Sequence, residues 1–190
     1  MLEEQKPTGL GAWSNELARE QPDERRDIQR TINLWRRHVT DDGLPPLLST
    51  FDFSAMKGDW GHRFLICSDP SIENAAFVIY GIKLAELLDL PARVTASIPL
   101  LQLVPERYRP VFTDGCRKSI TGSAPAKFSG SSSRNSKAEL YRAVFLPIRL
   151  HPNWSKRLVF GSFNYRIISG TQKTECALGA KRGLTPHVIG

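Results

Sequence analysis

The sequence has few cysteines and histidines, and their spacing argues against metal or disulfide chemistry. Cys67, Cys116 and Cys176 are far apart, and no two stand at the interval of a metal site or a disulfide framework. They are interpreted as small buried or tail thiols in a reducing compartment, because a reactive thiolate needs an electropositive site that the sequence does not show. The histidines, at positions 38, 62, 151 and 187, lack an H-x-x-x-H spacing. We therefore expect no bound metal and no cofactor.

Long apolar runs are also missing. Nothing approaches the roughly 20 apolar residues that cross a bilayer, and the start "MLEEQKPTGLGAW" has acidic residues and glycines where a secretory signal carries a basic segment and an apolar stretch. We expect a cytoplasmic protein with no membrane partner. The chain of 190 residues, 41% of them hydrophobic, suits a single domain.

The chain is basic, with a formal net charge of +7, which raises the question of a nucleic-acid partner. The excess charge is spread out, partly in a tail and partly on one segment that also carries Asp23, Glu24 and Asp27. Within that segment Arg25, Arg26, Arg36 and Arg37 fall at intervals that wrap around a helix instead of forming one stripe. We therefore do not expect nucleic acid as the partner, although a basic nucleic-acid-binding protein remains an alternative function.

An amphipathic helix is predicted near the N-terminus, over residues 23–40. Pro22 and the capping residue Asp23 begin it, and Gly43 and Pro45 follow its end. Its apolar stripe has spacings of four, three and four residues and consists of Ile28, Ile32, Trp35 and Val39. The stripe is narrow and carries a tryptophan, so this helix must dock as a lid on the domain or at a dimer interface. Residues 1–22 before it read as a flexible leader, and 168–190 as a flexible tail.

The middle of the chain alternates strand-like and helix-like segments. Residues 62–68 predict a strand, and 72–80 suit either a strand or the start of a helix, with the β-branched Val78 and Ile79 favouring a strand. The run "IKLAELLDLP" predicts a short helix that Pro91 closes, residues 110–121 predict a second helix that ends at Gly122, and "AKFSGSSS" predicts a strand.

The most informative stretch is the pair of apolar runs in "ELYRAVFLPIRLHPNWSKRLVFGSFNYRI". Alternate side chains of a strand point to opposite faces, and neither face of these two runs is polar. Both faces of the sheet should therefore be covered: one by the central helices and the other by the helix at 23–40, with a second copy of the chain completing it. Pro147 must occupy a bulge or a position without a ladder hydrogen bond. Gly161 marks the close approach of backbone, a helix or a ligand, and we favour backbone packing over a ligand.

This ribbon resembles the last two strands of the stand-alone PAS-like proteins common in alphaproteobacteria. The segments "INLWRRH", "IENAAFVIYG" and "VPERYRPVF" are similar to other elements of that family, and the likeness covers about 23–167. It implies an α+β fold with a five-stranded antiparallel sheet, helices on one face, a small cavity between them, and a homodimer formed through the N-terminal helix. Cys67 does not match the flavin motif of photoreceptor PAS domains, the helix at 110–121 lacks the histidine of haem PAS domains, and no output segment is attached.

The function favoured by these observations is a non-catalytic sensory or regulatory module for signal transduction. A small apolar ligand or a signalling protein partner would shift the sheet and the N-terminal helix between two packings. The candidate ligand-pocket residues are Phe77, Phe145, Phe160, Ser162 and Asn164, although each of them can also simply fill the core. An enzyme is less favoured, because no spacing links a nucleophile to a base among Asp52, Asp59, His62, Glu73 and Asp114.

Overall fold

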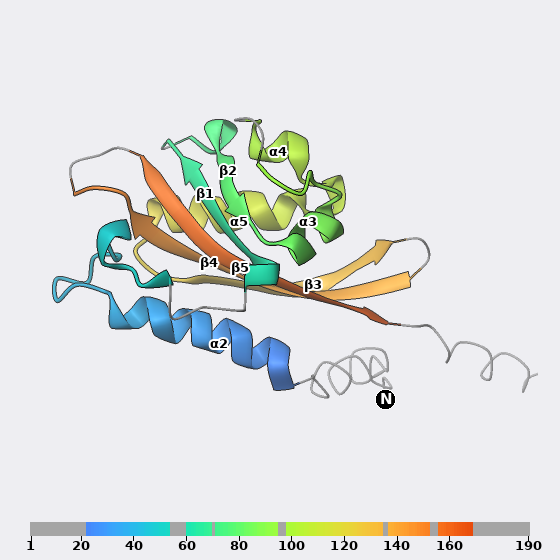
Figure 1. The fold of residues 1–190 in the computed structure, drawn as a ribbon, viewed down its shortest axis with the longest axis horizontal. Helices are drawn as coiled ribbons and strands as arrows, with labels where there is room; N and C mark the ends of the chain where they lie inside the picture. The colour runs from blue at the N-terminus through green and yellow to red at the C-terminus, as the bar shows by residue number, and fades with distance from the viewer. Residues whose placement is uncertain are drawn as a thin grey trace, which may run out of the picture.

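The computed structural model describes residues 22–53, 60–69, 71–94, 98–134, 137–152 and 156–168. Apart from Pro22 and Ile168, the leader and the tail expected from the sequence lie outside these ranges. The described residues form an α+β fold with one five-stranded antiparallel sheet (Figure 1). The fold class implied by the PAS resemblance is therefore confirmed.

The sheet has the strand order β2-β1-β5-β4-β3, so the first and last strands of the chain lie next to each other. In antiparallel pairs, β1 joins β2 and β5, and β4 joins β5 and β3. The strands are β1 (Arg63–Ser68), β2 (Ala76–Tyr80), β3 (Ala126–Arg134), β4 (Lys137–Arg149) and β5 (Arg157–Ile168).

Helices cover both faces of this sheet. On one face lie α3 (Ile82–Leu88), α4 (Leu100–Leu103) and α5 (Arg109–Thr121), while α2 (Pro22–Arg37) lies on the opposite face (Figure 1). Short 3-10 turns connect them: η1 (Leu48–Thr50), η3 (Trp60–His62), η4 (Ile72–Asn74) and η5 (Glu106–Tyr108). The two-sided covering predicted from the apolar ribbon is confirmed.

The structure differs from the sequence prediction most clearly in three places. The first helix ends at Arg37, three residues early, because His38 N–H bonds back to the Trp35 carbonyl at 3.1 Å and the chain then turns through Gly43 at φ 75°. Residues 72–80 divide between the two alternatives, since η4 precedes β2. The connector after Pro99 contains one more helical turn, α4.

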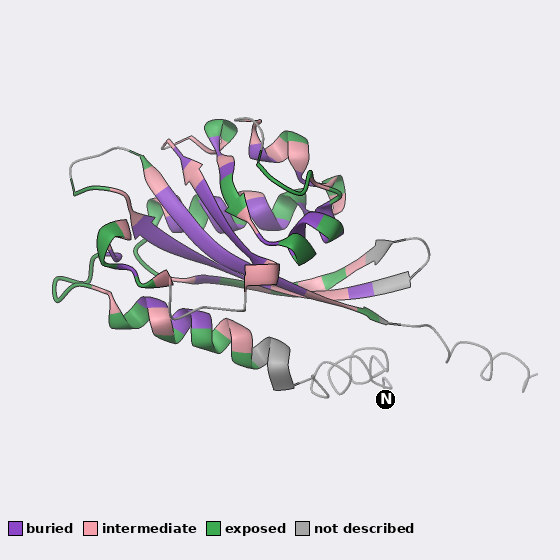
Figure 2. Ribbon diagram, viewed as in Figure 1, coloured by how far each residue is buried: buried purple, intermediate pink, exposed green. Residues whose placement is uncertain are grey.

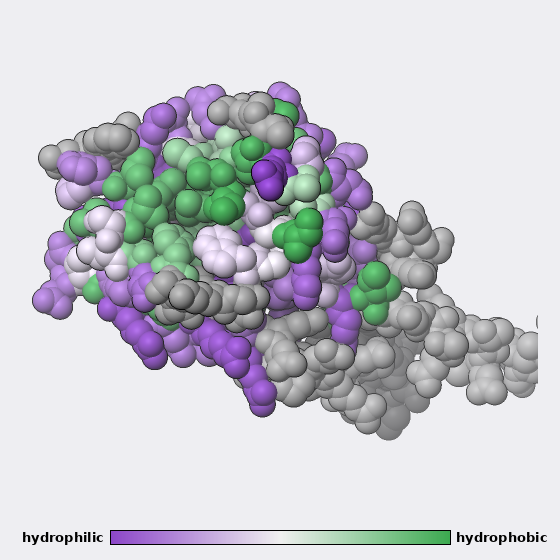
Figure 3. Space-filling view, viewed as in Figure 1, coloured by the Kyte–Doolittle hydropathy of each residue, from purple (hydrophilic) through white to green (hydrophobic). Residues whose placement is uncertain are grey.

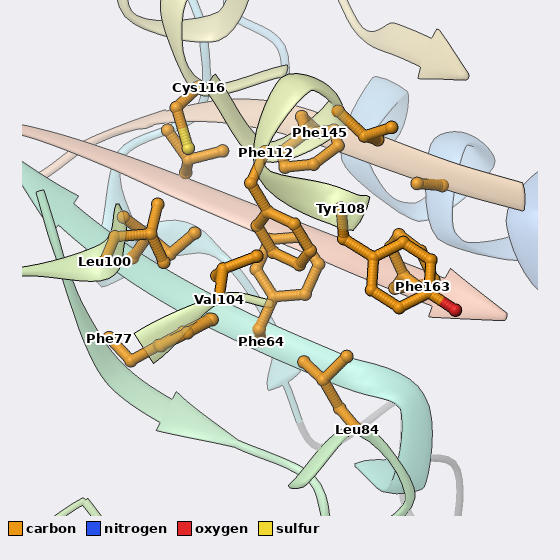
Figure 4. Packing of buried hydrophobic residues seen from close by; sticks show 14 of the residues in the cluster. Phe64, Phe77, Leu84, Leu100, Val104, Tyr108, Phe112, Cys116, Phe145 and Phe163 are labelled. Atoms are coloured by element: carbon orange, nitrogen blue, oxygen red, sulfur yellow. The ribbon is translucent and has the colours of Figure 1, made fainter. Parts of the chain in front are cut away.

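The sheet separates two hydrophobic cores, and buried residues run along the centres of its strands (Figure 2). The helix-side core is rich in aromatic rings from β1, α5, β4 and β5, among them Phe64, Phe112, Phe145 and Phe163 (Figure 4). The α2-side core contains Ile32, Trp35, Phe51, Leu65, Val144, Leu146, Ile148, Leu158 and Phe160. Val144 and Phe145 thus enter different cores, as the two-residue period of a strand requires.

Pro147 and Gly161 have structural explanations. β3 begins opposite Phe145, so Pro147 lies beyond β3 on a stretch of β4 where a proline interrupts no ladder bond on that side. Past Pro147, segment 45–47 covers the same edge: Arg149 N–H donates to the Pro46 carbonyl at 2.8 Å. A Cβ on Gly161 would lie 2.2 Å from Cζ of Phe64 and 2.5 Å from the Val144 carbonyl oxygen, so this glycine permits close packing.

Candidate functional site

The five candidate ligand-pocket residues divide between the two faces of the sheet. Phe77 and Phe145 belong to the helix-side core, where each has its ring against Phe64 and Phe112. Phe160 lies in the α2-side core. Ser162 and Asn164 lie on the same face as Phe160 and are also buried. The structure therefore brings together three of the five, and it separates them from the other two by the thickness of the sheet.

The apolar stripe of α2 contacts the outer face of the sheet. Ile32 and Trp35 are buried there, and Ile28 and Val39 pack beside them while partly exposed. The indole Nε1–H of Trp35 donates to the Pro147 carbonyl at 2.7 Å in a buried hydrogen bond. Trp35 thereby uses the carbonyl of the residue that cannot take part in a strand ladder through its own nitrogen.

A buried polar network, which the sequence did not reveal, joins α2 to the middle of the sheet. Asp27 Oδ1 accepts from Arg63 Nη2 of β1 at 2.7 Å, and its Oδ2 accepts from Ser162 Oγ of β5 at 2.8 Å and from Asn164 Nδ2 at 3.1 Å. Asn164 also donates to Ser162 Oγ at 3.0 Å. One carboxylate therefore holds α2 to two neighbouring strands. We call these four residues the Asp27 network.

Burial and charge act in opposite directions on Asp27. Removal from water raises its pKa. The hydrogen bonds from Arg63, Ser162 and Asn164, together with the positive charge of Arg63, outweigh this effect and hold the pKa below the ordinary 3.8. Arg63 is only 2% exposed, against 18% for the Asp27 side chain. The ionised carboxylate is therefore the form that fits this site, and α2 is bound by charge as well as by apolar contact.

His62 stands beside the network, at the end of η3. Burial lowers the pKa of His62, nearby Lys83 lowers it further, and the Asp27 carboxylate partly opposes them. Its ring meets Tyr165 with centroids 6.0 Å apart. Near neutral pH this imidazole is therefore mostly uncharged.

A second buried polar group lies at the helix-side core. The Tyr108 hydroxyl donates to Glu139, a carboxylate that is 1% exposed, and Arg107 Nε lies 3.9 Å from the same carboxylate. Burial, together with Glu139, raises the pKa of Tyr108 to about 12. The hydroxyl is therefore protonated at neutral pH and serves as a hydrogen-bond donor that ties η5 to β4.

The residues considered for an enzyme site that the structure describes lie on separate elements. Asp52 follows η1, Glu73 lies in η4, and Asp114 lies on α5 with Arg117 Nη1 3.4 Å from it. Asp59 is outside the described ranges. Across those ranges, no three His, Cys, Asp or Glu side chains are grouped in a way that suits a metal ion.

Both cysteines that the structure describes are free thiols with raised pKa values. Burial raises the pKa of Cys67, and it raises that of Cys116 to about 12. Thiols of this kind react slowly at neutral pH, because the thiolate is the nucleophile. Cys176 lies outside the described residues.

The arginines of α2 whose side chains the structure describes lie at the surface, and Arg30 shares one side of the helix with two of them. Arg26, Arg30, Arg36 and Arg37 are all exposed, because Ile32 and Trp35 take the side that faces the sheet. Arg30 lies four residues after Arg26 and seven residues before Arg37, so these three share one side of the helix. Arg36 is displaced from that side. Arg25, whose side chain the structure does not describe, adds nothing to this comparison.

Two comparisons of the sequence with known proteins found no match. No protein-family model matches the chain, and no curated protein is similar to it in sequence. The described helices also include none that is long and apolar enough to span a membrane. Fold and side-chain geometry are thus the basis for proposing a function.

Proposed function

We propose that this chain is a non-catalytic sensory or regulatory PAS-like module in the cytoplasm. In this proposal, a small apolar ligand or a protein partner shifts α2 between two packings on the sheet, and the change is relayed through protein–protein contacts. The observation that carries the proposal is the Asp27 network, which places a buried ionic contact inside an otherwise apolar interface. Buried ion pairs often add little net stability, and we propose that this one fixes the position of α2 on the sheet. α2 is therefore held in a defined position by a contact that can be broken.

The core on the other face of the sheet is connected to this network. The ring of Phe64 belongs to the helix-side core and packs against Gly161. Phe64 follows Arg63, and Gly161 precedes Ser162, so each contact partner is next to a member of the network. A displacement of Phe64 by a ligand among the aromatic rings would alter the relative positions of β1 and β5. The three bonds that Asp27 makes across these strands would then lose their geometry.

Movement of α2 between its two packings can be followed at the indole of Trp35, because the Nε1–H bond to the Pro147 carbonyl exists only while α2 is docked. We expect ¹⁵N relaxation dispersion on the full chain to show exchange at this indole on the microsecond to millisecond timescale. Asp27→Asn should increase the exchange, since it removes the charge that binds Arg63. Flat dispersion profiles for the indole in both proteins would refute a movable α2.

The stimulus is identified by native mass spectrometry of the purified full chain. A copurified small molecule supports the ligand form of the proposal, and a homodimer supports relay through a second copy. Light scattering after size exclusion measures the same association at several concentrations. A ligand-free monomer at every concentration leaves a different protein partner as the required stimulus, which a pull-down with the full chain then tests against Asp27→Asn.

A nucleic-acid-binding protein is the second candidate, and the exposed arginines of α2 favour it. Arg26, Arg30 and Arg37 on one side of a surface helix can contact successive phosphates. Fluorescence anisotropy with a random-sequence duplex tests this, because binding should weaken steeply as salt rises and should fall in Arg30→Gln. No binding at low salt would end this candidate.

A further inference from the structure

The two outer strands of the sheet differ in how far their free edges are covered. β2 is short, and its register against β1 shifts between Leu65 and Ile66, as at a β-bulge. Its outer side is also partly occupied, because Leu100 N–H donates to the Ala75 carbonyl at 2.6 Å. In the space-filling view, apolar side chains gather over this side of the molecule (Figure 3). The bulge and the bond to Leu100 oppose the addition of another strand at β2.

The outer strand on the other side of the sheet, β3, is longer and regular. It pairs with β4 from Ala126 to Arg134 without a register shift. The end of this hairpin extends beyond α2 and α5 (Figure 1). Within the described ranges, no backbone hydrogen bond from a segment outside the sheet reaches β3. A regular edge of this kind is a template for one more strand.

The register shows which backbone groups of β3 point outward. Arg134 pairs with Lys137, and only two residues separate them in the chain. Such a pair exchanges both of its ladder hydrogen bonds, so the even-numbered residues of β3 bond to β4 and the odd-numbered ones direct their N–H and C=O away from it. Lys127, Ser129 and Ser131 therefore present these groups to the outside, and all three residues are exposed. We call these three residues the β3 edge.

The surroundings of the β3 edge are basic. Lys127 lies on the α2 face of the sheet, and Arg142 of the neighbouring β4 lies on the same face. On the opposite face, the Lys118 ammonium of α5 lies 5.1 Å from the centroid of the Phe128 ring. The carboxylate of Glu139, on β4, is only 1% exposed and contributes little charge to this surface. An acidic ligand therefore matches the edge better than a basic one does.

We propose that the β3 edge binds an extended acidic segment of a partner protein, which joins the sheet as a sixth strand. The open row of N–H and C=O groups favours a peptide over a nucleic acid, because a peptide backbone completes such a ladder. Lys127 and Lys118 favour acidic side chains on that peptide. A second copy of the same edge is a poorer match, since its basic residues would meet like charges. This binding goes beyond the proposed movement of α2 and does not depend on it.

The test is an NMR titration of the ¹⁵N-labelled full chain with a peptide as long as β3 that alternates glutamate and threonine. We expect saturable shifts at the amides of Lys127, Ser129 and Ser131. A matched peptide with lysine in place of glutamate should bind about tenfold more weakly. A glutamate peptide methylated at its backbone nitrogens should lose binding to the same extent, because it cannot donate to β3.

Substitutions in β3 separate the backbone ladder from the charge. Ser129→Pro removes an outward N–H without breaking a bond to β4, and proline is accepted on the open side of an edge strand. It should weaken binding about tenfold, whereas Ser129→Ala, which keeps the N–H, should not. Lys127→Glu should also weaken binding. Its matched control is Lys156→Glu, which makes the same change of charge at an exposed lysine just before β5 and should leave binding unchanged.

The proposal is overturned if millimolar glutamate peptide shifts none of the β3 amides. Equal binding of the methylated peptide would overturn it as well, and so would equal affinities of Ser129→Pro and Ser129→Ala. If a random-sequence oligonucleotide shifts these amides and the glutamate peptide does not, the basic surface belongs to a nucleic-acid site and the proposal fails.

Discussion

Gly161 has no room for a side chain, because Phe64 and Val144 close in on it from two sides. We predict that Gly161→Ala destabilises the fold by about 1–3 kcal/mol, the usual cost of overpacking a core. Chemical denaturation of the full chain measures this change in the free energy of unfolding.

Gly61→Ala is the matched control for this substitution. The three atoms nearest to a Cβ at Gly61 all belong to the Lys83 side chain, the closest at 3.1 Å, and a flexible lysine can move aside. We expect a change below about 0.5 kcal/mol there. Equal stabilities for Gly161→Ala and Gly61→Ala would show that Phe64 does not pack as described.

Asp27 is predicted to matter far more than a surface carboxylate. Asp27→Ala leaves the 2% exposed Arg63 without its ion pair to α2, at a cost of about 3 kcal/mol, the lower end for broken buried pairs because Asp27 itself is 18% exposed. Asp114→Ala breaks an exposed pair on α5 and should cost about 0.5 kcal/mol or less. Urea denaturation compares the two, and similar losses would contradict a buried network.

The acid dependence of stability follows from the lowered pKa of Asp27. The folded protein holds this pKa below the ordinary 3.8, so the Asp27 contribution is complete above that value and is lost as the pH falls through the folded pKa. Wild type should therefore exceed Asp27→Asn by a constant margin at pH 5–7, and the margin should shrink below pH 4. Thermal unfolding at each pH measures it, and a margin that persists unchanged at pH 2 would argue against an ionised Asp27.

At the scale of elements, periodicity predicted most of what the structure contains. The apolar stripe at Ile28, Ile32 and Trp35 identified α2, and the two-faced ribbon identified β4, β5 and the need for covers on both sides. Such patterns are visible because they repeat within a few residues. The helix end at Arg37 and the division of 72–80 were missed, since local hydrogen bonds decide them.

The Asp27 network could not be predicted in the same way. Asp27 stands among charged residues that read as a solvated helix face, and its partners are 36 and more than 130 residues away along the chain. The sequence suggested Ser162 and Asn164 as candidate ligand-pocket residues that can also simply fill the core, and it gave no sign that they pair with Asp27. Pairing of residues so distant is set by strand order, which the local pattern does not contain.

Docking of α2 is predicted to depend on Trp35 in two separable ways. Trp35→Phe keeps a large ring but removes the 2.7 Å bond to the Pro147 carbonyl, which should cost about 1–2 kcal/mol. Trp35→Ala also removes the ring and should cost about 3–5 kcal/mol. Asn33→Ala on the exposed side of α2 is the control, and denaturation curves measure all three. If Trp35→Ala costs no more than Asn33→Ala, α2 is not a packed cover.

On the scale of the whole molecule, the sheet divides one domain into two cores of different construction. The helix-side core is built from aromatic rings of η5, α5 and the strands, with leucines of α3 and α4 packed against them. The α2-side core relies on one helix, the segment around Phe51, and the Asp27 network. Because α2 precedes the sheet in the chain and is joined to it by these contacts, we propose that it leaves as a unit while the helix-side core stays folded.

Hydrogen exchange on the full chain, with and without Asp27→Asn, tests this separation most directly. We predict that the substitution raises exchange in α2 and along β4 near Pro147, while amides of α5 and β1 keep their protection. A uniform rise over α2, α5 and β1 would instead mean that the domain opens as one cooperative unit, and it would contradict a movable α2.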